Sequence, residues 1–595
     1  MFRSFRFTYS LAQITKDGIM AEAMVTTHWD METDLLVAGA GPAGMTAALV
    51  AAIEGLNVVV CEKASQVGGT GATSAGTLWI PGNTQSRDAG FEDSPEQAAK
   101  YLDSLIGEDL TSEHRRVYLR DGPGVIDYLA EKTDVRFLPC GLHPDYRNNI
   151  EGAGKSGRAI IPENFDGRLL GRDFERVRPP IPEFMLMGGM MVGKLDIVSL
   201  LGRYRSVVKF KHSASIVLRY LTDRLRFRRG TRLVMGNALV GRLFYSLKKR
   251  NVPVLFESPI AEFVRDQDGT VLGAVLATAE GEKRIRARKG VVLATGGFAH
   301  NPKYREAFMP QPTPPYSLAA GSNAGDGLAL AETADASVDS DSHQGAGFWT
   351  PVSVTKRDDG TEGLFPHLAM DRAKPGLIAV NAAGRRFVNE GVSYHDFVEA
   401  MYRSHETADT MPAWLICETR FIAKYGLGAI HPETRNLTKH IRSGYVQVAD
   451  DLGALADLVG IDPAGLQDSV TRHNRFALTG VDEDFGKGDL ELNRFNGDPS
   501  HGPNPCLAPI EAGPFAAMAV WPAEIGCSVG ISTDPDCRVL DGENQPIAGL
   551  YACGNDMGSV MSGAYPGPGT TLGPAVVFGW RAAMHAAGRL SANAV

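Results

Sequence analysis

Three glycines near the start of the chain have the spacing of a turn that binds phosphate groups. They are Gly39, Gly41 and Gly44, which form the pattern GxGxxG. In such a turn the first glycine permits the tight bend, the second lets a pyrophosphate approach the backbone, and the third allows a helix to pack closely on a strand. Glu62 follows at the offset where a carboxylate accepts the ribose hydroxyls of an adenosine. These residue types and offsets predict a dinucleotide-binding site.

The residues around this turn have the periodicity of the elements that would position it. The apolar run LLVA leads to Gly39, an alanine-rich segment continues as far as Gly55, and a second apolar run, LNVVVCE, ends at Glu62. These patterns predict a buried strand, a helix and a second strand. A second GxGxxG, GAGKSG at Gly152–Gly157, follows polar residues and leads into no helical pattern. We therefore expect a loop there, and no separate NAD(P) site is supported.

Length and composition indicate an ordinary globular protein of more than one domain. The chain has 595 residues, of which 44% are hydrophobic and 22% charged. Its formal net charge of -9 argues against a nucleic-acid partner, which requires a basic surface. The seven cysteines are scattered without a CxxC pair, which indicates reduced thiols in a cytoplasm and neither a disulfide framework nor a metal site. Residues 1–30 resemble neither a domain nor a signal peptide, and we expect an extension there.

A strongly basic segment lies at residues 194–229. It contains ten lysine and arginine residues and two aspartates, interleaved with valine, leucine and aromatic residues. Two interpretations remain open: a basic amphipathic segment that rests on a membrane surface, or the solvated face of a helical insertion, which is the more common case. No stretch of the chain is long and apolar enough to indicate a membrane span.

Three further segments resemble recurring elements of the large family of flavoproteins with two dinucleotide-binding domains. They are VGGTGATSAGTLWIPGN (Val67–Asn83), GVVLATGGF (Gly290–Phe298) and GLYACGND (Gly549–Asp556). The resemblance implies that the dinucleotide is FAD, and that the last segment returns beside the flavin to close its site. Members with covalent flavin carry a histidine in the part of the chain that corresponds to Glu62–Trp79. This chain has none there, so we expect non-covalent FAD.

The same resemblance implies an α/β fold with a discontinuous FAD-binding domain. We expect a Rossmann-like domain of the GR2 type at residues 31–300 and 528–595, with a helical insertion at 178–250. An α+β substrate and catalytic domain is expected to be inserted at 301–527. The residues expected to bind the cofactor are Gly39, Gly41, Pro42, Ala43, Gly44, Glu62, Lys63, Gly69, Thr70, Thr73, Ser74, Ala294, Thr295, Gly296, Gly297, Asp326, Gly554, Asn555, Thr571 and Leu572.

Four longer motifs resemble the fumarate reductase and ketosteroid dehydrogenase branch of these enzymes, and within it the 3-ketosteroid Δ1-dehydrogenases. They are GSNAGDG (Gly321–Gly327), NAAGRRFVNEGVSYHDF (Asn381–Phe397), TGVDEDFGKGD (Thr479–Asp489) and AYPGPGTTLGPA (Ala564–Ala575). They occur in the order found in that family. The resemblance implies an FAD-dependent dehydrogenase that introduces a C=C bond α,β to a cyclic ketone.

The glycine- and proline-rich motif carries the residues that would bind the ketone. In the family, a tyrosine hydroxyl and a main-chain N–H four residues later contact the ketone oxygen. Negative charge develops on this oxygen as the neighbouring carbon loses its proton, so preorganised donors are needed there. Tyr565 and Gly569 match this pair.

Tyr394 matches the tyrosine that removes the proton in the family. A phenol with a pKa near ~10 needs a stabilised anion to act as a base at neutral pH. Tyr146, in HPDYRN, stands at about the place of the second tyrosine that gives this help. His395 can tune Tyr394 or be structural, and the second is the more ordinary case because adjacent side chains point apart. The β-hydrogen would leave as hydride to flavin N5.

Other reactions remain as alternatives. A fumarate reductase-like C=C reductase clamps a dicarboxylate with arginines, but Tyr394 stands at the offset of its arginine donor and Gly558–Val577 contains no arginine or histidine. A 3-ketosteroid Δ4(5α)-dehydrogenase or a dehydrogenase of smaller cyclic ketones would use the same donor pair. Tyr316 and Phe348 stand where the steroid enzymes commonly carry tryptophan, which leaves the ring system open. We expect a quinone or another electron acceptor in place of NAD.

Overall fold

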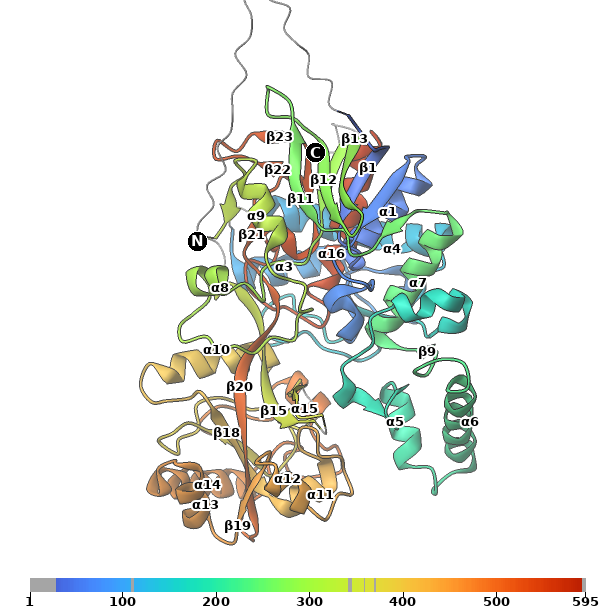
Figure 1. Ribbon diagram of the computed structural model, residues 1–595. Helices are drawn as coiled ribbons and strands as arrows, with labels where there is room; N and C mark the ends of the chain where they lie inside the picture. Colours follow the sequence, from blue (N-terminus) through green and yellow to red (C-terminus); the bar gives the residue numbers. More distant parts are fainter. Residues whose placement is uncertain (1–27, 109–111, 341–344, 358, 369–370, 591–595) are drawn as a thin grey trace, which may run out of the picture.

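Two sheets organise the chain, one in the upper half of Figure 1 and one in the lower half. The computed structural model describes residues 28–590 except 109–111, 341–344, 358 and 369–370. The extension expected at 1–30 lies, as far as residue 27, outside the described residues, and the first strand begins at Met31. Among the described residues no helix has the length and apolar character needed to cross a membrane.

The upper sheet has a parallel core that continues into antiparallel strands. Its central strands are fully buried because they consist of unbroken apolar runs such as VVVC, as parallel strands covered on both faces require. The parallel strands, in spatial order, are β10 (Val254–Leu255), β2 (Val58–Cys61), β1 (Met31–Ala38), β13 (Gly281–Leu293) and β23 (Pro546–Ala552). The antiparallel strands are β12 (Val271–Thr278) and β11 (Ile260–Arg265), which continue from β13, and β22 (Arg538–Leu540), which pairs with β23.

Three helices pack next to one another beside this sheet. α1 (Pro42–Ile53) begins with proline at its first position, which a helix N-terminus tolerates because that N–H needs no partner. It packs against α16 (Leu572–Ala586) and α7 (Met235–Lys249), so the end of the chain returns to the first helix. A Cβ at Gly579 of α16 would lie 2.6 Å from the carbonyl oxygen of Ala43, which shows how closely α1 and α16 approach.

The lower sheet is antiparallel and is connected to the upper half by one long strand. β20 (Phe515–Cys527) pairs with β18 (Ala413–Glu418) along its first half and with β15 (Gly347–Lys356) along its second half. The outer strands are β16 (Glu362–Pro366), β17 (Leu377–Val380) and β19 (Gln447–Ala449). The helices of this half are α10 (Tyr394–His405), α11 (Thr419–Tyr425), α12 (Thr438–Arg442), α13 (Leu452–Val459), α14 (Pro463–Thr479) and α15 (Glu491–Asn496).

Further elements connect and cover the upper sheet. The helices are α2 (Thr84–Asp88), α3 (Pro95–Ile106), α4 (Ser112–Lys132), α8 (Pro302–Phe308) and α9 (Asp326–Glu332), with the 3-10 turns η1 (Gly69–Thr73), η2 (Gly167–Arg176), η3 (Pro182–Phe184) and η4 (Gly554–Asp556). The short strands are β3 (Leu78–Trp79), β4 (Phe137–Pro139), β5 (Ala159–Pro162), β6 (Phe165–Asp166), β7 (Met185–Leu186), β8 (Met190–Met191), β9 (Arg232–Leu233), β14 (Val338–Asp339) and β21 (Gly530–Ile531).

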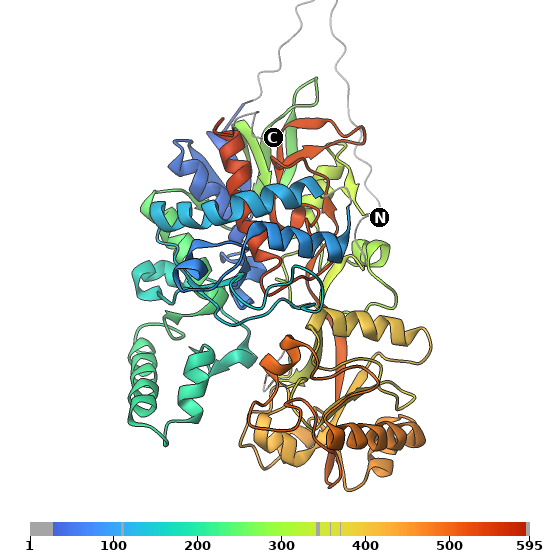
Figure 2. The ribbon, with the colours of Figure 1, turned by 180° about the vertical axis from the view of Figure 1, so that it is seen from behind.

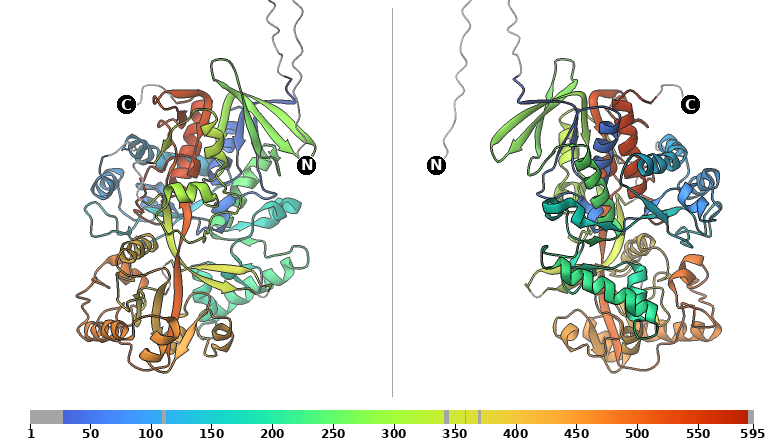
Figure 3. Two further views of the ribbon diagram at one scale, coloured as in Figure 1. Left: turned by 60° about the vertical axis from the view of Figure 1, so that its left-hand side comes forward. Right: turned by 90° about the vertical axis from the view of Figure 1, so that its right-hand side faces the viewer.

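A helical hairpin stands apart from both sheets. It consists of α5 (Lys194–Leu201) and α6 (Val207–Asp223), and it lies beside the lower half while its chain ends lead back to the upper half (Figures 1 and 2). The right-hand view of Figure 3 presents this hairpin to the viewer. α7, which follows it, packs against α1 and η1. The projecting part of the helical insertion expected at 178–250 therefore ends before α7.

Candidate active site

The carboxyl ends of four parallel strands meet at one edge of the upper sheet. Ala38 at the end of β1 pairs with Cys61 of β2 and with Leu293 of β13, and Leu293 pairs in turn with Ala552 of β23. Ligands of open α/β sheets bind at this edge. Most of the residues predicted to bind the cofactor follow directly after these strands, at 39–44, 62–63, 294–297 and 554–555.

The three glycines of GxGxxG differ in the space around them, as their predicted roles require. A Cβ at Gly39 would lie 2.2 Å from the carbonyl oxygen of Ala294, and one at Gly44 would lie 2.0 Å from the carbonyl oxygen of Gly39. A Cβ at Gly41 would meet nothing within 4 Å. Gly41 is also the N-cap of α1, where backbone N–H groups and the helix dipole favour a phosphate.

Asp556 holds two of these segments together, although the sequence analysis did not single it out. Its carboxylate accepts hydrogen bonds from the amide and the hydroxyl of Thr295, from the Gly296 amide at 3.1 Å and from the Gly297 amide at 2.8 Å. The side chain is buried, and burial raises the pKa of its carboxyl above the ordinary value. The turn after β13 is thereby clamped to the turn after β23.

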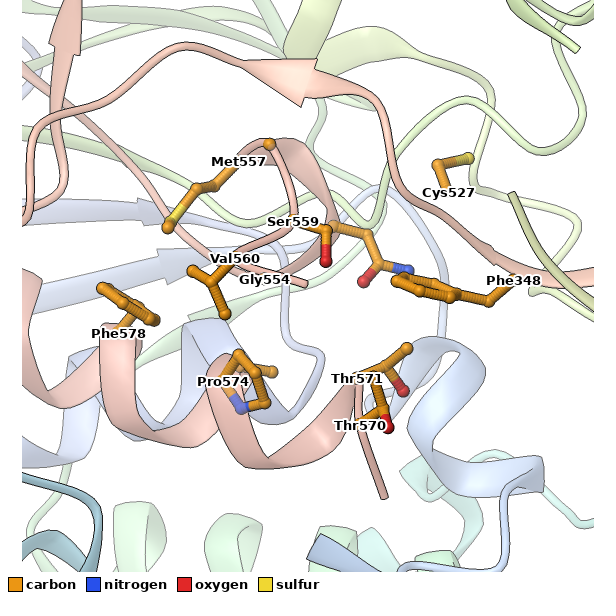
Figure 4. Close-up of a pocket in the computed structure, with 13 residues that line it drawn as sticks. Phe348, Cys527, Gly554, Met557, Ser559, Val560, Thr570, Thr571, Pro574 and Phe578 are labelled. Carbon is orange, nitrogen blue, oxygen red and sulfur yellow. The ribbon is translucent and has the colours of Figure 1, made fainter. Parts of the chain in front are cut away.

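A pocket opens between this edge and the lower half (Figure 4). It is lined by Gly554, Asn555 and Thr571, which were predicted to bind the cofactor, and by Phe348 of β15 and Cys527 of β20. In Figure 4, Phe348 approaches the pocket opposite the start of α16, where Thr571 stands directly before Leu572. The pocket therefore lies where the two halves of the molecule meet.

Three tyrosines from distant parts of the chain lie together beside Phe348. The Tyr394 hydroxyl is 3.2 Å from the Tyr146 hydroxyl and 3.0 Å from the Tyr565 hydroxyl. The rings of Tyr146 and Tyr565 are stacked with centroids 5.6 Å apart, and Tyr394 meets both at steep angles. Burial raises the pKa of all three phenols well above the ordinary value of 10. We call this group the tyrosine cluster.

Buried charges position Tyr394 at the start of α10. Glu390 accepts two hydrogen bonds from Arg386 and lies 3.3 Å from the Lys487 ammonium. Burial alone would raise the pKa of Glu390, but these two cations outweigh it and lower the pKa to about 2. The buried Arg372 donates to the carbonyl oxygens of Glu390 and Val392, which fixes the segment that leads into the helix.

The glycine- and proline-rich run places Tyr565 by packing against β3 and the Tyr146 loop. The carbonyl oxygen of Pro566 accepts the Tyr146 amide at 2.9 Å. A Cβ at Gly567 would lie 2.6 Å from the Trp79 ring, and one at Gly569 would lie 2.5 Å from the Thr77 carbonyl oxygen. Gly569 is partly exposed, and no acceptor in the described part of the chain pairs with its amide. The phenol and the uncommitted amide thus lie on one rigid turn.

A model of the FAD binding domain family matches residues 34–572. The chain belongs to this family. FAD is therefore its cofactor, and the structure has the mixed α/β fold of these flavoproteins, as predicted. The residues present fit the group, since Gly41 leaves open space at the N-terminus of α1 and Asp556 fixes the neighbouring turn.

Individual dehydrogenases of this family resemble the chain along almost its whole length. It is 37% identical to the 4-oxocyclohex-2-ene-1-carboxylate 5-dehydrogenase of Sinomonas cyclohexanicum, over 96% of this chain and 96% of that enzyme. It is 35% identical to the 3-oxosteroid 1-dehydrogenase of Mycolicibacterium smegmatis, over 94% of this chain and 98% of that enzyme. The solved 3-ketosteroid delta1-dehydrogenase from Sterolibacterium denitrificans in complex with 1,4-androstadiene-3,17-dione has a TM-score of 0.87 at 34% identity, covering 94% of this chain and 100% of that chain. The predicted resemblance to 3-ketosteroid Δ1-dehydrogenases is confirmed.

Some residues predicted to bind FAD make contacts within the protein. Glu62 accepts the amides of Ala40 at 2.7 Å and Ala64 at 2.8 Å, and burial raises the pKa of its carboxyl. Each carboxylate oxygen can accept further hydrogen bonds, so a ribose contact at Glu62 is compatible with these partners. Lys63 and Asp326 form an ion pair with each other at 2.6 Å.

The glycine-rich loop after β2 is connected to the other FAD-binding segments. The Thr70 hydroxyl accepts the Ala320 amide at 2.9 Å and the Asn323 side-chain amide at 3.1 Å, and Asn323 also donates to the Gly296 carbonyl oxygen. Within η1, which begins at Gly69, the hydroxyls of Thr73 and Ser74 donate hydrogen bonds to the carbonyl oxygens of Thr70 and Gly71. The second GxGxxG, at 152–157, is a loop, as expected.

Proposed function

We propose that the protein is an FAD-dependent dehydrogenase that introduces a C=C bond α,β to a cyclic ketone, by 1(2)-dehydrogenation of a 3-ketosteroid. The observation that carries this proposal is the tyrosine cluster, in which one phenol contacts two others at 3.0 and 3.2 Å beside the pocket at the FAD edge. Its relatives include enzymes named for this reaction, at 35% identity.

The proposed reaction assigns a separate task to each residue. The Tyr565 hydroxyl and the Gly569 amide donate to the ketone oxygen, where negative charge develops. Tyr394 takes the proton from the neighbouring carbon, and the Tyr146 hydroxyl stabilises the Tyr394 oxygen through their hydrogen bond. FAD, when bound, supplies the acceptor for the hydride that leaves the next carbon. The electrons then pass to a quinone or another acceptor.

The side chains around the cluster favour a steroid as the substrate. Phe348, Leu492 and Ile525 pack with the tyrosines, so the surroundings are apolar and suit a steroid. Arg147 follows Tyr146 in the chain, but its guanidinium is paired with carboxylates of Asp396 and Glu399. A small oxocyclohexane carboxylate would need a free cation. The 37% identity to a dehydrogenase of such an acid nevertheless makes it the second candidate.

The proposed roles agree with a division of the chain into two domains. The FAD-binding domain comprises residues 31–300 and 528–595, has a Rossmann-like arrangement and holds FAD non-covalently. The inserted domain at 301–527 supplies Tyr394 and Phe348. Support comes from β20, which carries the chain from the lower sheet back to the upper half (Figure 1). α9 and β14 fall within 301–527 but lie beside the upper sheet, where β14 pairs with β21, so this first part of the inserted segment packs with the FAD-binding domain.

Anaerobic bleaching of the bound flavin tests the proposal. A 3-ketosteroid such as androst-4-ene-3,17-dione should reduce the flavin rapidly, and NMR of the product should place the new double bond at C1–C2. Faster bleaching by 4-oxocyclohexanecarboxylate would favour the second candidate. A double bond at C4–C5 from a 5α-steroid would indicate the Δ4(5α) reaction. Rapid reoxidation of the reduced enzyme by fumarate, without bleaching by any ketone, would refute the dehydrogenase and support a C=C reductase.

A further inference from the structure

The α5–α6 hairpin presents apolar side chains to solvent in unusual number. Tyr204 at its tip is 82% exposed, and Val207 and Val208 at the start of α6 are 71% and 77% exposed. Leu218 and Leu221 of the same helix are also exposed. Val207, Leu218 and Leu221 follow at intervals of whole helical turns, so they form one stripe along α6. We call Val207, Leu218 and Leu221, together with the neighbouring Tyr204 and Val208, the hairpin stripe.

The opposite side of α6 is the side that packs against the protein. Ser213, Ile216 and Tyr220 are buried, and they lie about half a turn away from the hairpin stripe. The Tyr220 hydroxyl donates to the Met187 carbonyl oxygen, and the buried carboxylate of Asp223 accepts the amide and the hydroxyl of Thr231 at 2.8 Å. These contacts fix the rotation of the helix, so the stripe faces outward. A solvated helix would place polar residues there.

A carboxylate between the two helices fixes the shape of the hairpin. Asp196 of α5 lies 2.7 Å from the His212 ring of α6 and 2.9 Å from Arg232 of β9. The hairpin is therefore a braced unit that leads from the upper half of the molecule, and its apolar stripe is a fixed part of the surface.

Exposed basic side chains lie on the same segment of the chain as the stripe. Arg205 and Lys211 are exposed next to it, and Arg224, Arg226 and Arg228 are exposed just beyond the end of α6. The segment is strongly cationic in a chain whose formal net charge is -9. Apolar side chains on one face with lysines and arginines around them is the pattern of helices that lie in the interface of an anionic bilayer.

We propose that the hairpin is a docking surface for anionic lipid membranes, with the hairpin stripe in the acyl boundary and the arginines at the headgroups. Self-association is disfavoured, because a two-fold contact would bring two cationic patches together. A nucleic acid would leave the apolar stripe uncovered. The proposal concerns binding to a surface and is independent of the reaction at the tyrosine cluster.

Co-sedimentation with vesicles tests the docking surface, with purified FAD-loaded protein. The protein should bind mixed phosphatidylcholine–phosphatidylglycerol vesicles and release them as salt is raised, with far weaker binding to phosphatidylcholine alone, since each basic residue contributes roughly fivefold. The triple variant Val207→Ser, Val208→Ser, Leu218→Ser should lose at least about tenfold in vesicle binding. All three side chains are exposed, so the variant should keep its flavin spectrum and its turnover of a soluble ketone.

A matched control changes exposed apolar residues elsewhere. Leu458 of α13 and Leu478 of α14 are 54% and 76% exposed, and Leu458→Ser with Leu478→Ser should bind vesicles like the unchanged protein. Equal binding by the triple variant, or no binding to anionic vesicles at low salt, would overturn the proposal. So would a drop in molecular mass of the triple variant in light scattering without vesicles, because the stripe would then be an interface between copies of the chain.

Discussion

Replacing Tyr394 with phenylalanine separates the proton-removal step from everything else in the site. The change deletes one hydroxyl, which contacts the hydroxyls of Tyr146 and Tyr565, and keeps the ring that packs on both. Loss of a positioned base typically lowers the rate by about 10² to 10⁴, which corresponds to roughly 3–5 kcal/mol in the barrier. FAD content should stay unchanged, because the hydroxyl that is removed contacts the phenols of Tyr146 and Tyr565 and the ring is kept.

The pH dependence makes this prediction sharper. Burial raises the pKa of Tyr394 above 10, and the phenolate is the form that accepts a proton. The fraction of phenolate therefore rises about tenfold for each pH unit below the pKa. Stopped-flow reduction of the flavin by substrate should give a kcat/KM that climbs with slope near one from about pH 7 to 9. In Tyr394→Phe the residual rate should be flat over the same range.

Tyr402→Phe is the matched control. Tyr402 is on the same helix, but its ring packs against the ring of Trp349, with centroids 5.4 Å apart, and not against the tyrosine cluster. It should keep the rate and the pH profile of the unchanged protein. A Tyr394→Phe protein with more than a tenth of normal turnover, or a rate of the unchanged protein that does not vary with pH, would contradict the assignment of Tyr394 as the base.

Three other variants probe neighbouring parts of the site. Tyr565→Phe removes one of two donors to the ketone oxygen, and single-turnover flavin reduction should slow by about 10² to 10³ while the flavin spectrum stays normal. Asp556→Asn replaces a buried carboxylate that accepts four hydrogen bonds. We expect this variant to lose FAD more readily on gel filtration, and its free energy of unfolding to be lower by about 2–3 kcal/mol. Arg386→Ala leaves Glu390 and Asp482 as buried carboxylates without their guanidinium partner, so urea titration should show a loss of about 3–5 kcal/mol.

The acid stability of the unchanged protein follows from the same buried pairs. The pKa of Glu390 is lowered to about 2 in the folded state, so its contribution to stability is complete above the ordinary pKa of 4.5. As the pH falls toward 2 the folded state loses that contribution. Tm should therefore decrease between about pH 5 and 2, and the part due to Glu390 should be absent in Glu390→Gln.

The nucleotide-binding turn could be predicted because its determinants are adjacent in sequence. Strand, GxGxxG turn, helix and second strand fall within residues 31–62, and each is specified by its own apolar periodicity. The close approach at Gly44 is local, since it is made by the carbonyl oxygen of Gly39, whereas the one at Gly39 is made by Ala294 of a distant strand. The loop at 152–157 could be predicted for the same reason, because its flanking residues lack both the strand and the helix periodicity.

Contacts between distant segments could be predicted only through the family resemblance. Tyr394 and Tyr565 lie in long motifs, whereas Tyr146 was expected only from the short HPDYRN, which lies on an irregular loop with no periodicity. Its hydroxyl contact to Tyr394 depends on the packing of that loop. Asp556 was missed because its partners Thr295 and Gly297 lie about 260 residues earlier, and nothing in GND distinguishes a carboxylate that clamps a turn from one that faces solvent.

The hairpin shows the limit of periodicity in another way. The sequence of α6 contains both a polar and an apolar face, and an amphipathic pattern does not say which face packs against the protein. The sequence analysis left open a segment that rests on a membrane and the solvated face of a helical insertion, with the second as the more common case. The hydrogen bonds of Tyr220 to Met187 and of Asp223 to Thr231 fix which side of α6 packs against the protein, and they turn the apolar stripe outward. Such contacts are tertiary and leave no local signal.

The role of the Gly569 amide is tested by changing Tyr565 and not by changing Gly569. Gly569 has φ +97, and a Cβ there would lie 2.5 Å from the Thr77 carbonyl oxygen, so Gly569→Ala would distort the turn that also carries Tyr565. A loss of activity in Gly569→Ala would therefore not distinguish the loss of the amide donor from a displacement of the Tyr565 phenol. In Tyr565→Phe the turn is kept and one donor remains. Tyr394 is intact in this variant, so any rate above that of the uncatalysed reaction includes the contribution of the Gly569 amide. If Tyr565→Phe reacts no faster than the uncatalysed reaction, the amide is excluded as a donor.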